Sequence, residues 1–303
     1  MKNYKYFTTF IALLLVICNG IQPSSADDAL VIIDLQADQV KVTSEGYEFL
    51  SGDDELAGEV IFADQDSEIL IGESSENSVQ LLISIDSSSA PSDYSFEIPG
   101  LATIENLKVG KRTLHRLVGP GDSTLGWLAE AWAHDANDQK ISTSFSVQGN
   151  VLTQHIDTNQ DGIRYPITAD PYLGKNLISS VTKEVVSGNN LLHVKVSNWM
   201  WDVYGIYTGT LGVAGYTTAY QIAVNYGWQE VLDKYGAKYG AQYRGYVATK
   251  ATLKDQFDCH AFGAPALYMG VILGTDPQPT WDLESYRSHV QDAGVWISSR
   301  CNW

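Results

Sequence analysis

The chain has 303 residues, with 36 Asp and Glu against 19 Lys and Arg, so its formal net charge is −17. That length allows one or two domains of ordinary size. Contacts with phosphate backbones need clustered Lys and Arg, so we expect no nucleic-acid partner for a chain this acidic.

The first 26 residues have the three parts of a secretory signal peptide. Lys2 and Lys5 supply positive charge, residues 10–18 form an apolar run of nine, and Ala26 ends a small-residue cleavage site. Nine residues are too few to cross a bilayer, which needs about 20, so we expect no transmembrane segment in the mature protein. Lipidation at Cys18 is a lesser alternative, because Ile17 is large for that position. The sequence predicts a secreted, extracellular protein.

Charge and aromatic content both change near Asp170. Residues 27–170 hold 26 acidic and 7 basic side chains, whereas residues 171–303 hold 10 of each, together with six of the eight Trp. We interpret this change as a domain boundary. The expected organisation is an acidic, largely flexible leader over 27–67, a β-rich domain over 68–171 and a C-terminal domain over 172–303. Only residues 29–35 of the leader have a strand-like apolar run, so we expect at most one or two strands there.

Short apolar or alternating segments separated by turn residues indicate strands in the β-rich domain. We predict them over residues 68–71, 78–85, 94–98, 114–118, 127–132, 142–147 and 151–155. Residues 148–150 (QGN) form a hairpin turn. The pattern predicts an antiparallel sheet or sandwich. Residues 131–171 resemble a module that precedes varied C-terminal domains in secreted Gram-positive proteins. The resemblance implies a presenting role, although a plain scaffold is the favoured interpretation.

Residues 172–303 mix strand and helix patterns. Two strands are predicted over 177–186 and 191–201, and an apolar stripe predicts a helix over 217–235 that ends at Gly236. A capping box from Thr252 to Asp255 opens a shorter predicted helix, which Gly263 and Pro265 stop near residue 262. The fold class is therefore mixed: a β-rich N-terminal domain followed by a small α+β domain.

Beyond the signal peptide the chain has two cysteines, Cys259 and Cys301. An even count in an exported chain favours a disulfide between these two residues. We therefore include one disulfide in the predicted C-terminal domain. The alternatives are a catalytic thiol, which would leave the second cysteine unexplained, and a zinc pair. Zinc needs three or four nearby ligands, and only His260 is close in sequence.

Three blocks near the C-terminus carry a family resemblance: residues 255–260 (DQFDCH), residues 279–284 (PTWDLE) with Arg287 nearby, and residues 300–302 (RCN). They resemble a secreted bacterial family catalogued as domain of unknown function 2599. The resemblance covers the C-terminal third and implies no known activity. Residues 267–274 are an apolar insertion relative to the family pattern.

Five polar residues in these blocks are the candidate site: Asp255, Gln256, His260, Glu284 and Arg287. A histidine beside a carboxylate can act as a general base near neutral pH, and an arginine can bind an anion. The alternative is structural, with Asp255 as a helix cap, Glu284 paired with Arg287, and His260 in the core.

Asp157, Asn159 and Asp161 match the first half of a calcium-binding loop. The twelfth position of such a loop needs a bidentate Glu, and here it is Thr168. A turn between two strands explains the same residues, so we expect no cofactor, with calcium as the lesser alternative.

Two hypotheses of function follow. The first is an extracellular binding or surface-interaction protein, in which the β-rich domain presents a C-terminal domain that binds a cell-surface component such as a polysaccharide. The second is a secreted hydrolase or antibacterial effector whose active module is the C-terminal domain. A cleft that contains His260 and a carboxylate would favour the second.

Overall fold

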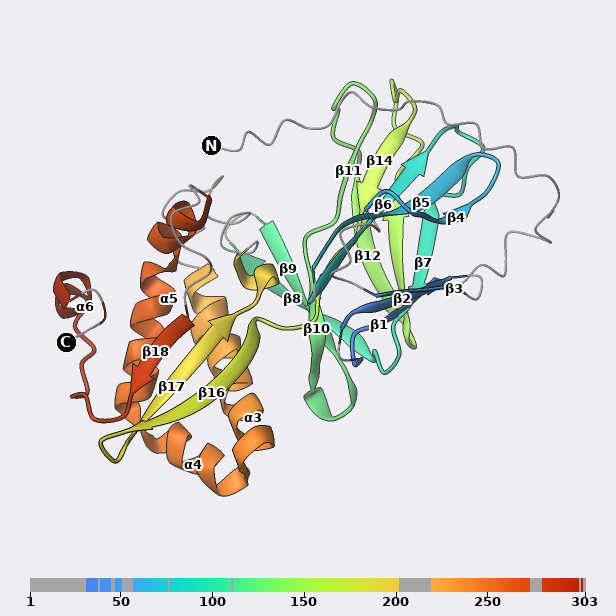
Figure 1. Cartoon of the computed structure of the whole chain (residues 1–303). Helices are drawn as coiled ribbons and strands as arrows, with labels where there is room; N and C mark the ends of the chain where they lie inside the picture. Colours follow the sequence, from blue (N-terminus) through green and yellow to red (C-terminus); the bar gives the residue numbers. More distant parts are fainter. Residues whose placement is uncertain are drawn as a thin grey trace.

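The structure is a computed structural model, which describes residues 31–37, 39–44, 47–50, 57–75, 77–109, 112–201, 219–272, 280–299 and 301. The signal peptide, the segment 202–218 and most of the 267–274 insertion lie outside these residues or have no described side chains. Figure 1 shows two parts, which we call the β-rich part and the C-terminal part. The predicted mixed fold, with its antiparallel sheets, its helical C-terminal region and one disulfide, is confirmed.

One sheet of the β-rich part has six strands. Their order is β12 (Thr143–Gln148), β13 (Val151–Ile156), β7 (Asp93–Glu97), β1 (Val31–Asp34), β2 (Lys41–Ser44) and β3 (Tyr47–Leu50). All neighbours pair antiparallel except β1 and β7, which are parallel. The hairpin β12–β13 turns through Gly149 at φ 62°, as residues 148–150 predict.

The second sheet has nine strands. Its main path runs β11 (Trp132–His134), β14 (Ile167–Asp170), β6 (Ser78–Ile85), β15 (Tyr172–Gly174), β10 (Thr124–Leu128), β9 (Arg112–Val118) and β8 (Thr103–Val109). Two further strands, β5 (Ser67–Ser75) and β4 (Val60–Ala63), continue from β6. Alternate residues of β6 are buried, and one apolar cluster joins them to Val31 and Ile33 of the six-stranded sheet.

The described residues of the leader form strands, which differs from the expected, largely flexible segment. Its described residues contribute β1, β2, β3 and β4, and Val31, Ile33, Leu35, Val40 and Val42 are buried in the core of the β-rich part. Apolar residues at every second position give these short strands one buried face, which outweighs the high charge of their surroundings. The expected boundary also falls early, because β15 lies after Pro171 and still belongs to the nine-stranded sheet.

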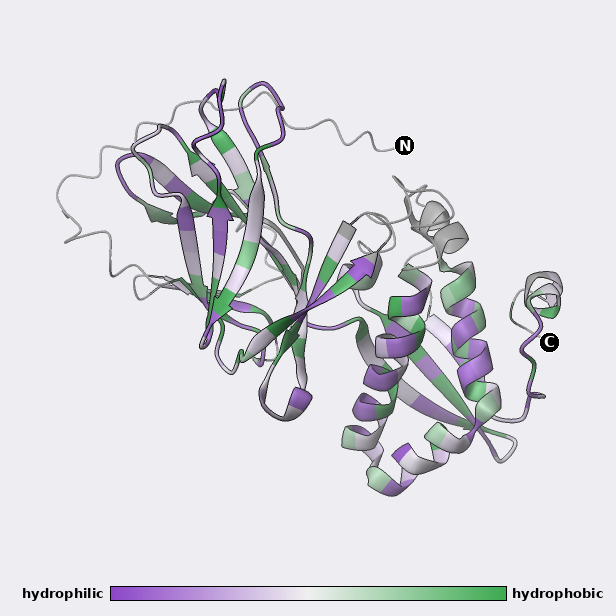
Figure 2. Cartoon of the chain, turned by 180° about the vertical axis from the view of Figure 1, so that it is seen from behind, coloured by the Kyte–Doolittle hydropathy of each residue, from purple (hydrophilic) through white to green (hydrophobic). Residues whose placement is uncertain are grey.

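The C-terminal part is a three-stranded antiparallel sheet covered by helices. The strands are β16 (Ile178–Val186), β17 (Asn189–Val196) and β18 (Thr280–Glu284), in that order. A π-helical turn (Ala223–Gly227) leads into α3 (Trp228–Tyr239), followed by α4 (Ala241–Thr249), α5 (Ala251–Ile272) and α6 (Ala293–Ser299). Figure 2 shows the longer helices over one face of this sheet, whose strands alternate in hydropathy. No helix within the described ranges has the length and apolar character that crossing a membrane requires.

Both predicted helices end later than expected. The first continues through Gly236 to Tyr239 and ends at Gly240, whose φ of 105° suits a residue without a side chain. The second, α5, runs past Gly263 and Pro265 to Ile272. Its buried positions Leu253, Phe257, Ala261 and Ala264 recur every three or four residues across the expected stop. Burial of this continuous stripe outweighs the local helix breakers.

The two parts meet at a packed seam. The apolar cluster of the C-terminal part includes Leu114 and Trp127 of the β-rich part. Glu230 of α3 accepts hydrogen bonds from the Trp127 indole (3.2 Å) and from the backbone N–H groups of Leu177 and Ile178 (2.8 and 2.9 Å). One carboxylate therefore joins a helix of the C-terminal part, a strand of the β-rich part and the chain that connects them.

Candidate functional site

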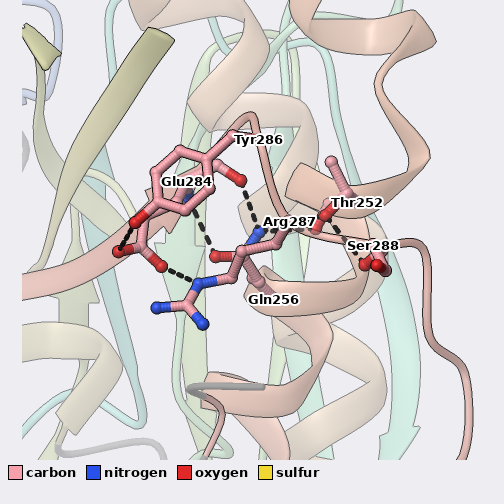
Figure 3. Close-up of polar contacts among 6 residues, drawn as sticks. All are labelled: Thr252, Gln256, Glu284, Tyr286, Arg287 and Ser288. Carbon is pink, nitrogen blue, oxygen red and sulfur yellow. Dashed lines mark hydrogen bonds and ion pairs between the residues drawn. The ribbon is translucent and has the colours of Figure 1, made fainter. Parts of the chain in front are cut away.

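Gln256 links α5 to the end of β18. Its amide oxygen accepts the backbone N–H of Glu284 (2.9 Å), and its amide nitrogen donates to the backbone carbonyl of the same residue (3.0 Å) and to that of Thr252 (3.0 Å), as Figure 3 shows. The side chain is 0% exposed. A buried amide with this set of partners fixes the position of the strand on the helix, and it has little left to offer a substrate.

Glu284 and Arg287 form an ion pair beside this amide. The Glu284 carboxylate pairs with the Arg287 guanidinium and also accepts the Tyr286 hydroxyl hydrogen (2.7 Å). The backbone N–H of Arg287 donates to the Glu284 carbonyl (3.3 Å). The group closes the turn after β18, which agrees with the structural alternative for these two residues.

Asp255 points to a different set of partners. Its carboxylate is almost fully buried, accepts the backbone N–H of Val290 (2.8 Å) and pairs with Nδ1 of His289 (2.5 Å). The expected capping box is therefore not formed, because Asp255 serves the segment after β18 and Thr252 donates to the Ser288 carbonyl (3.2 Å). His289, whose side chain is 55% exposed, is the residue that the sequence analysis missed.

His260 lies apart from the carboxylates of the predicted set. Its ring stacks on Trp281 with 5.8 Å between ring centroids and 12° between planes. Burial lowers the pKa of the imidazole to about 4, although a hydrogen bond to the Asp282 backbone opposes this shift. The structure thus brings Gln256, Glu284 and Arg287 together, and leaves Asp255 and His260 with other partners.

The lowered pKa of His260 is expected to make the stability of the protein depend on pH. Below the ordinary imidazole pKa of 6.5 the unfolded chain binds a proton that folded His260 does not, so wild-type stability falls as pH drops from 6.5 toward 4. His260→Asn removes that group. We therefore expect the stability gap between wild type and variant to shrink by roughly 2–3 kcal/mol between pH 7 and pH 4.5. Urea unfolding at both pH values measures the gap, in which all other titrating groups cancel. A constant gap would contradict a partly buried, neutral His260.

Substituting Gln256 is expected to lower the free energy of unfolding, because its buried hydrogen bonds are lost. Gln256→Met keeps the volume but removes the acceptor of the Glu284 N–H and leaves the Glu284 carbonyl with only the longer hydrogen bond from Arg287 (3.3 Å). Each buried group left unsatisfied costs about 1–3 kcal/mol. The matched control is Gln221→Met, because Gln221 is an exposed glutamine in the helical run that starts at residue 219. Denaturant unfolding of both variants tests this expectation, and equal stabilities would refute the linking role of Gln256.

The predicted disulfide is confirmed. Cys259, buried in α5, is bonded to Cys301, 42 residues later. The bond ties the segment after α6 to the middle of α5. A catalytic thiol and a zinc pair are thereby excluded for these two residues in the oxidised chain.

The residues proposed as a calcium loop lie in a turn between β13 and β14. The Asp157 carboxylate accepts the backbone N–H of Asn159 (3.2 Å), and Gly162 has φ 81°. Asp170 lies elsewhere, 3% exposed and bonded to the Gln80 amide (2.5 Å). In the part of the chain that the structure describes, no three His, Cys, Asp or Glu side chains gather in a way that could hold a metal.

A cleft of about 1020 Å³ opens at the seam between the two parts. Its walls come from the loop after β1, from β8 to β10, from the link at Lys175 and Asn176, and from the start of α3. None of the five predicted site residues lines it. Burial raises the pKa of the Glu230 carboxyl at its edge to about 7, although the donated hydrogen bonds oppose this shift.

Several acids and Arg116 of the cleft have charged partners, and Lys175 and Lys234 add two ammonium groups to its lining. Arg116 contacts Glu105 and Asp122 (both 2.6 Å), and its guanidinium lies 5.8 Å from the centre of the Tyr226 ring. Asp233 pairs with Arg244 (2.9 Å). The remaining polar lining is mostly amides and hydroxyls: Gln36, Ser123, Thr124, Asn176, Asn225 and Gln229.

Comparison of the chain with protein-family models, curated proteins and solved structures finds no match in any of the three. The resemblance to domain of unknown function 2599 therefore stays a prediction.

Proposed function

We propose that the protein is a secreted, extracellular binding protein that holds an uncharged, hydroxyl-rich ligand, such as a segment of a cell-surface polysaccharide, in the cleft between its two parts. The cleft itself is the observation that carries the proposal. Ligand sites are commonly concave, have volumes of about 300–1,000 Å³ and lie between domains. Its volume of about 1020 Å³ is slightly above that range and leaves room for an extended oligomer.

The chemistry of the walls supports a neutral ligand. Arg116, Glu105 and Asp122 satisfy one another, and the four acids and three bases of the lining nearly balance, so the cleft favours neither sign of charge. The Asn225 amide can both donate and accept, which matches the two roles of a sugar hydroxyl, whereas the Gln229 amide nitrogen already donates to Asp233 (3.0 Å). The Tyr226 ring adds an amphipathic surface.

The seam supports a preformed site. Glu230 fixes α3 against Trp127 and against the link at Leu177 and Ile178, so the walls on either side of the cleft are held before a ligand arrives. Less ordering on binding leaves more of the contact energy available as affinity.

A screen of the mature protein against neutral oligosaccharides, followed by calorimetry on the sugars that bind, tests the proposal. Asn225→Ala with Gln229→Ala removes two cleft amides, and we expect the affinity to fall about tenfold or more. The control is Gln221→Ala with Gln242→Ala, two exposed amides in the same helical region that do not line the cleft. Absence of any neutral sugar ligand, or equal affinities of the two double variants, would refute it.

A second candidate, a secreted hydrolase or antibacterial effector, is favoured by one observation. Buried Asp255 holds Nδ1 of half-exposed His289, which is the arrangement that lets the other ring nitrogen take a proton from water while the carboxylate stabilises the imidazolium. Expression of the full chain in a susceptible bacterium tests this candidate. Growth inhibition that His289→Gln abolishes and that the cleft variant retains would favour the hydrolase over the binding protein.

A further inference from the structure

A basic, tyrosine-rich segment stands out in this acidic chain. Residues 234–254 contain five basic side chains (Lys234, Lys238, Arg244, Lys250 and Lys254) and no Asp or Glu, although the whole chain has a net charge of −17. Four tyrosines lie in the same segment: Tyr235, Tyr239, Tyr243 and Tyr246. It forms the end of α3, all of α4 and the start of α5. In Figure 1, α4 lies at the end of the C-terminal part that faces away from the β-rich part.

Lysines and tyrosines interleave on this end of the molecule. Lys183 of β16 lies over both Tyr239 and Tyr243, 5.1 Å from each ring centroid. Lys238 lies 5.6 Å from the Tyr239 ring centroid, and Lys250 lies 5.0 Å from that of Tyr246. We call these six residues (Lys183, Lys238, Tyr239, Tyr243, Tyr246 and Lys250) the distal surface.

Apart from these lysine contacts, packing within the protein leaves the rings of α4 exposed. Tyr243 and Tyr246 are 45% and 37% exposed, and Val247 is the one buried residue of α4. The acids closest in sequence have other partners, since Asp233 pairs with Arg244 (2.9 Å) and Glu184 contacts His193 (3.4 Å). The distal surface therefore offers positive charge and aromatic rings together.

We propose that the distal surface binds an acidic polysaccharide. The ammonium groups match its carboxylates, and tyrosine rings pack against the C–H faces of sugars while their hydroxyls stay hydrated. A lipid surface fits less well, because residues 234–252 contain no Leu, Ile, Phe or Trp that could enter a bilayer. This site lies outside the cleft and takes an anionic polymer, so it does not depend on the neutral-ligand site proposed above.

Binding of the full mature chain to polygalacturonate, measured by calorimetry at low and at physiological salt, tests the proposal. We expect binding that weakens with salt. Lys238→Gln with Lys250→Gln should lower the affinity roughly tenfold, and Tyr243→Ala with Tyr246→Ala by a similar factor. Matched controls are Lys108→Gln with Lys140→Gln and the single change Tyr47→Ala, which alter exposed residues of the β-rich part and should change the affinity less than about twofold.

Three results would overturn it. The first is no binding of polygalacturonate by the wild-type chain. The second is equal binding of duplex DNA or of vesicles of anionic phospholipid, which would show a response to charge without recognition of sugar. The third is an unchanged affinity in the tyrosine double variant when its melting curve shows that it is folded. The cleft variant Asn225→Ala with Gln229→Ala should bind polygalacturonate normally, so failure of one site is distinguishable from failure of the other.

Discussion

Replacing both Cys259 and Cys301 by Ala is expected to lower the free energy of unfolding by about 4 kcal/mol. The bond closes a loop of 42 residues, and removing such a crosslink gives the unfolded chain more conformations to occupy. The loop contains β18 and most of α5, so the loss should appear in the cooperative unfolding of the C-terminal part. Chemical denaturation followed by circular dichroism measures the change.

Reduction of the wild-type protein provides the matched comparison. Reduced wild type and the double alanine variant should unfold at about the same denaturant concentration, below that of the oxidised protein. Non-reducing peptide mapping that finds both cysteines as free thiols would contradict the bond itself. An unchanged midpoint after reduction would contradict its stabilising role.

Gly174→Ala is expected to destabilise the protein by about 3 kcal/mol or more, because the site has no room for a side chain. A Cβ atom at this position would lie 2.2 Å from ring atoms of Trp199. Trp199 is fully buried and also meets Tyr172 edge to face, with 4.5 Å between ring centroids. Either the indole or the end of β15 must move, and overpacking of this kind typically costs 1–3 kcal/mol or more.

Gly245→Ala is the matched control for this change. Gly245 lies inside α4, and no atom comes within 4 Å of the position where its Cβ would be. Alanine there should stabilise the helix by up to about 1 kcal/mol. Thermal unfolding of the two variants should therefore shift in opposite directions. A Gly174→Ala variant as stable as the wild type would mean that Trp199 does not pack on β15 as described.

Periodic patterns predicted the regular elements well where burial follows the pattern. The strand β6 has the predicted bounds, residues 78–85, because its apolar residues alternate and one face lies in the core. The strand β1 lies inside the strand-like run 29–35, whereas β2 carries the alternating signal over only four residues within a highly charged segment. For α5, Gly263 and Pro265 predict an end near residue 262, but the helix continues past both because its buried stripe continues.

The candidate site depended on contacts that no local pattern encodes. The blocks around Gln256 and Glu284 do meet, 28 residues apart in sequence, through hydrogen bonds to the main chain. The partner of Asp255 is His289, which belongs to none of the recognisable blocks. The cleft could not be predicted from the sequence, because its walls come from segments more than 100 residues apart.

The seam limits how freely the two parts could be exchanged between proteins. A different C-terminal part placed after Gly174 would have to supply an acceptor for the Trp127 indole, as Glu230 does here. It would also need an apolar surface to cover Leu114 and Trp127, which the present C-terminal part keeps out of water. Exchange of the C-terminal part at this point is therefore expected to succeed only when the new part carries a matching acid and a matching apolar face.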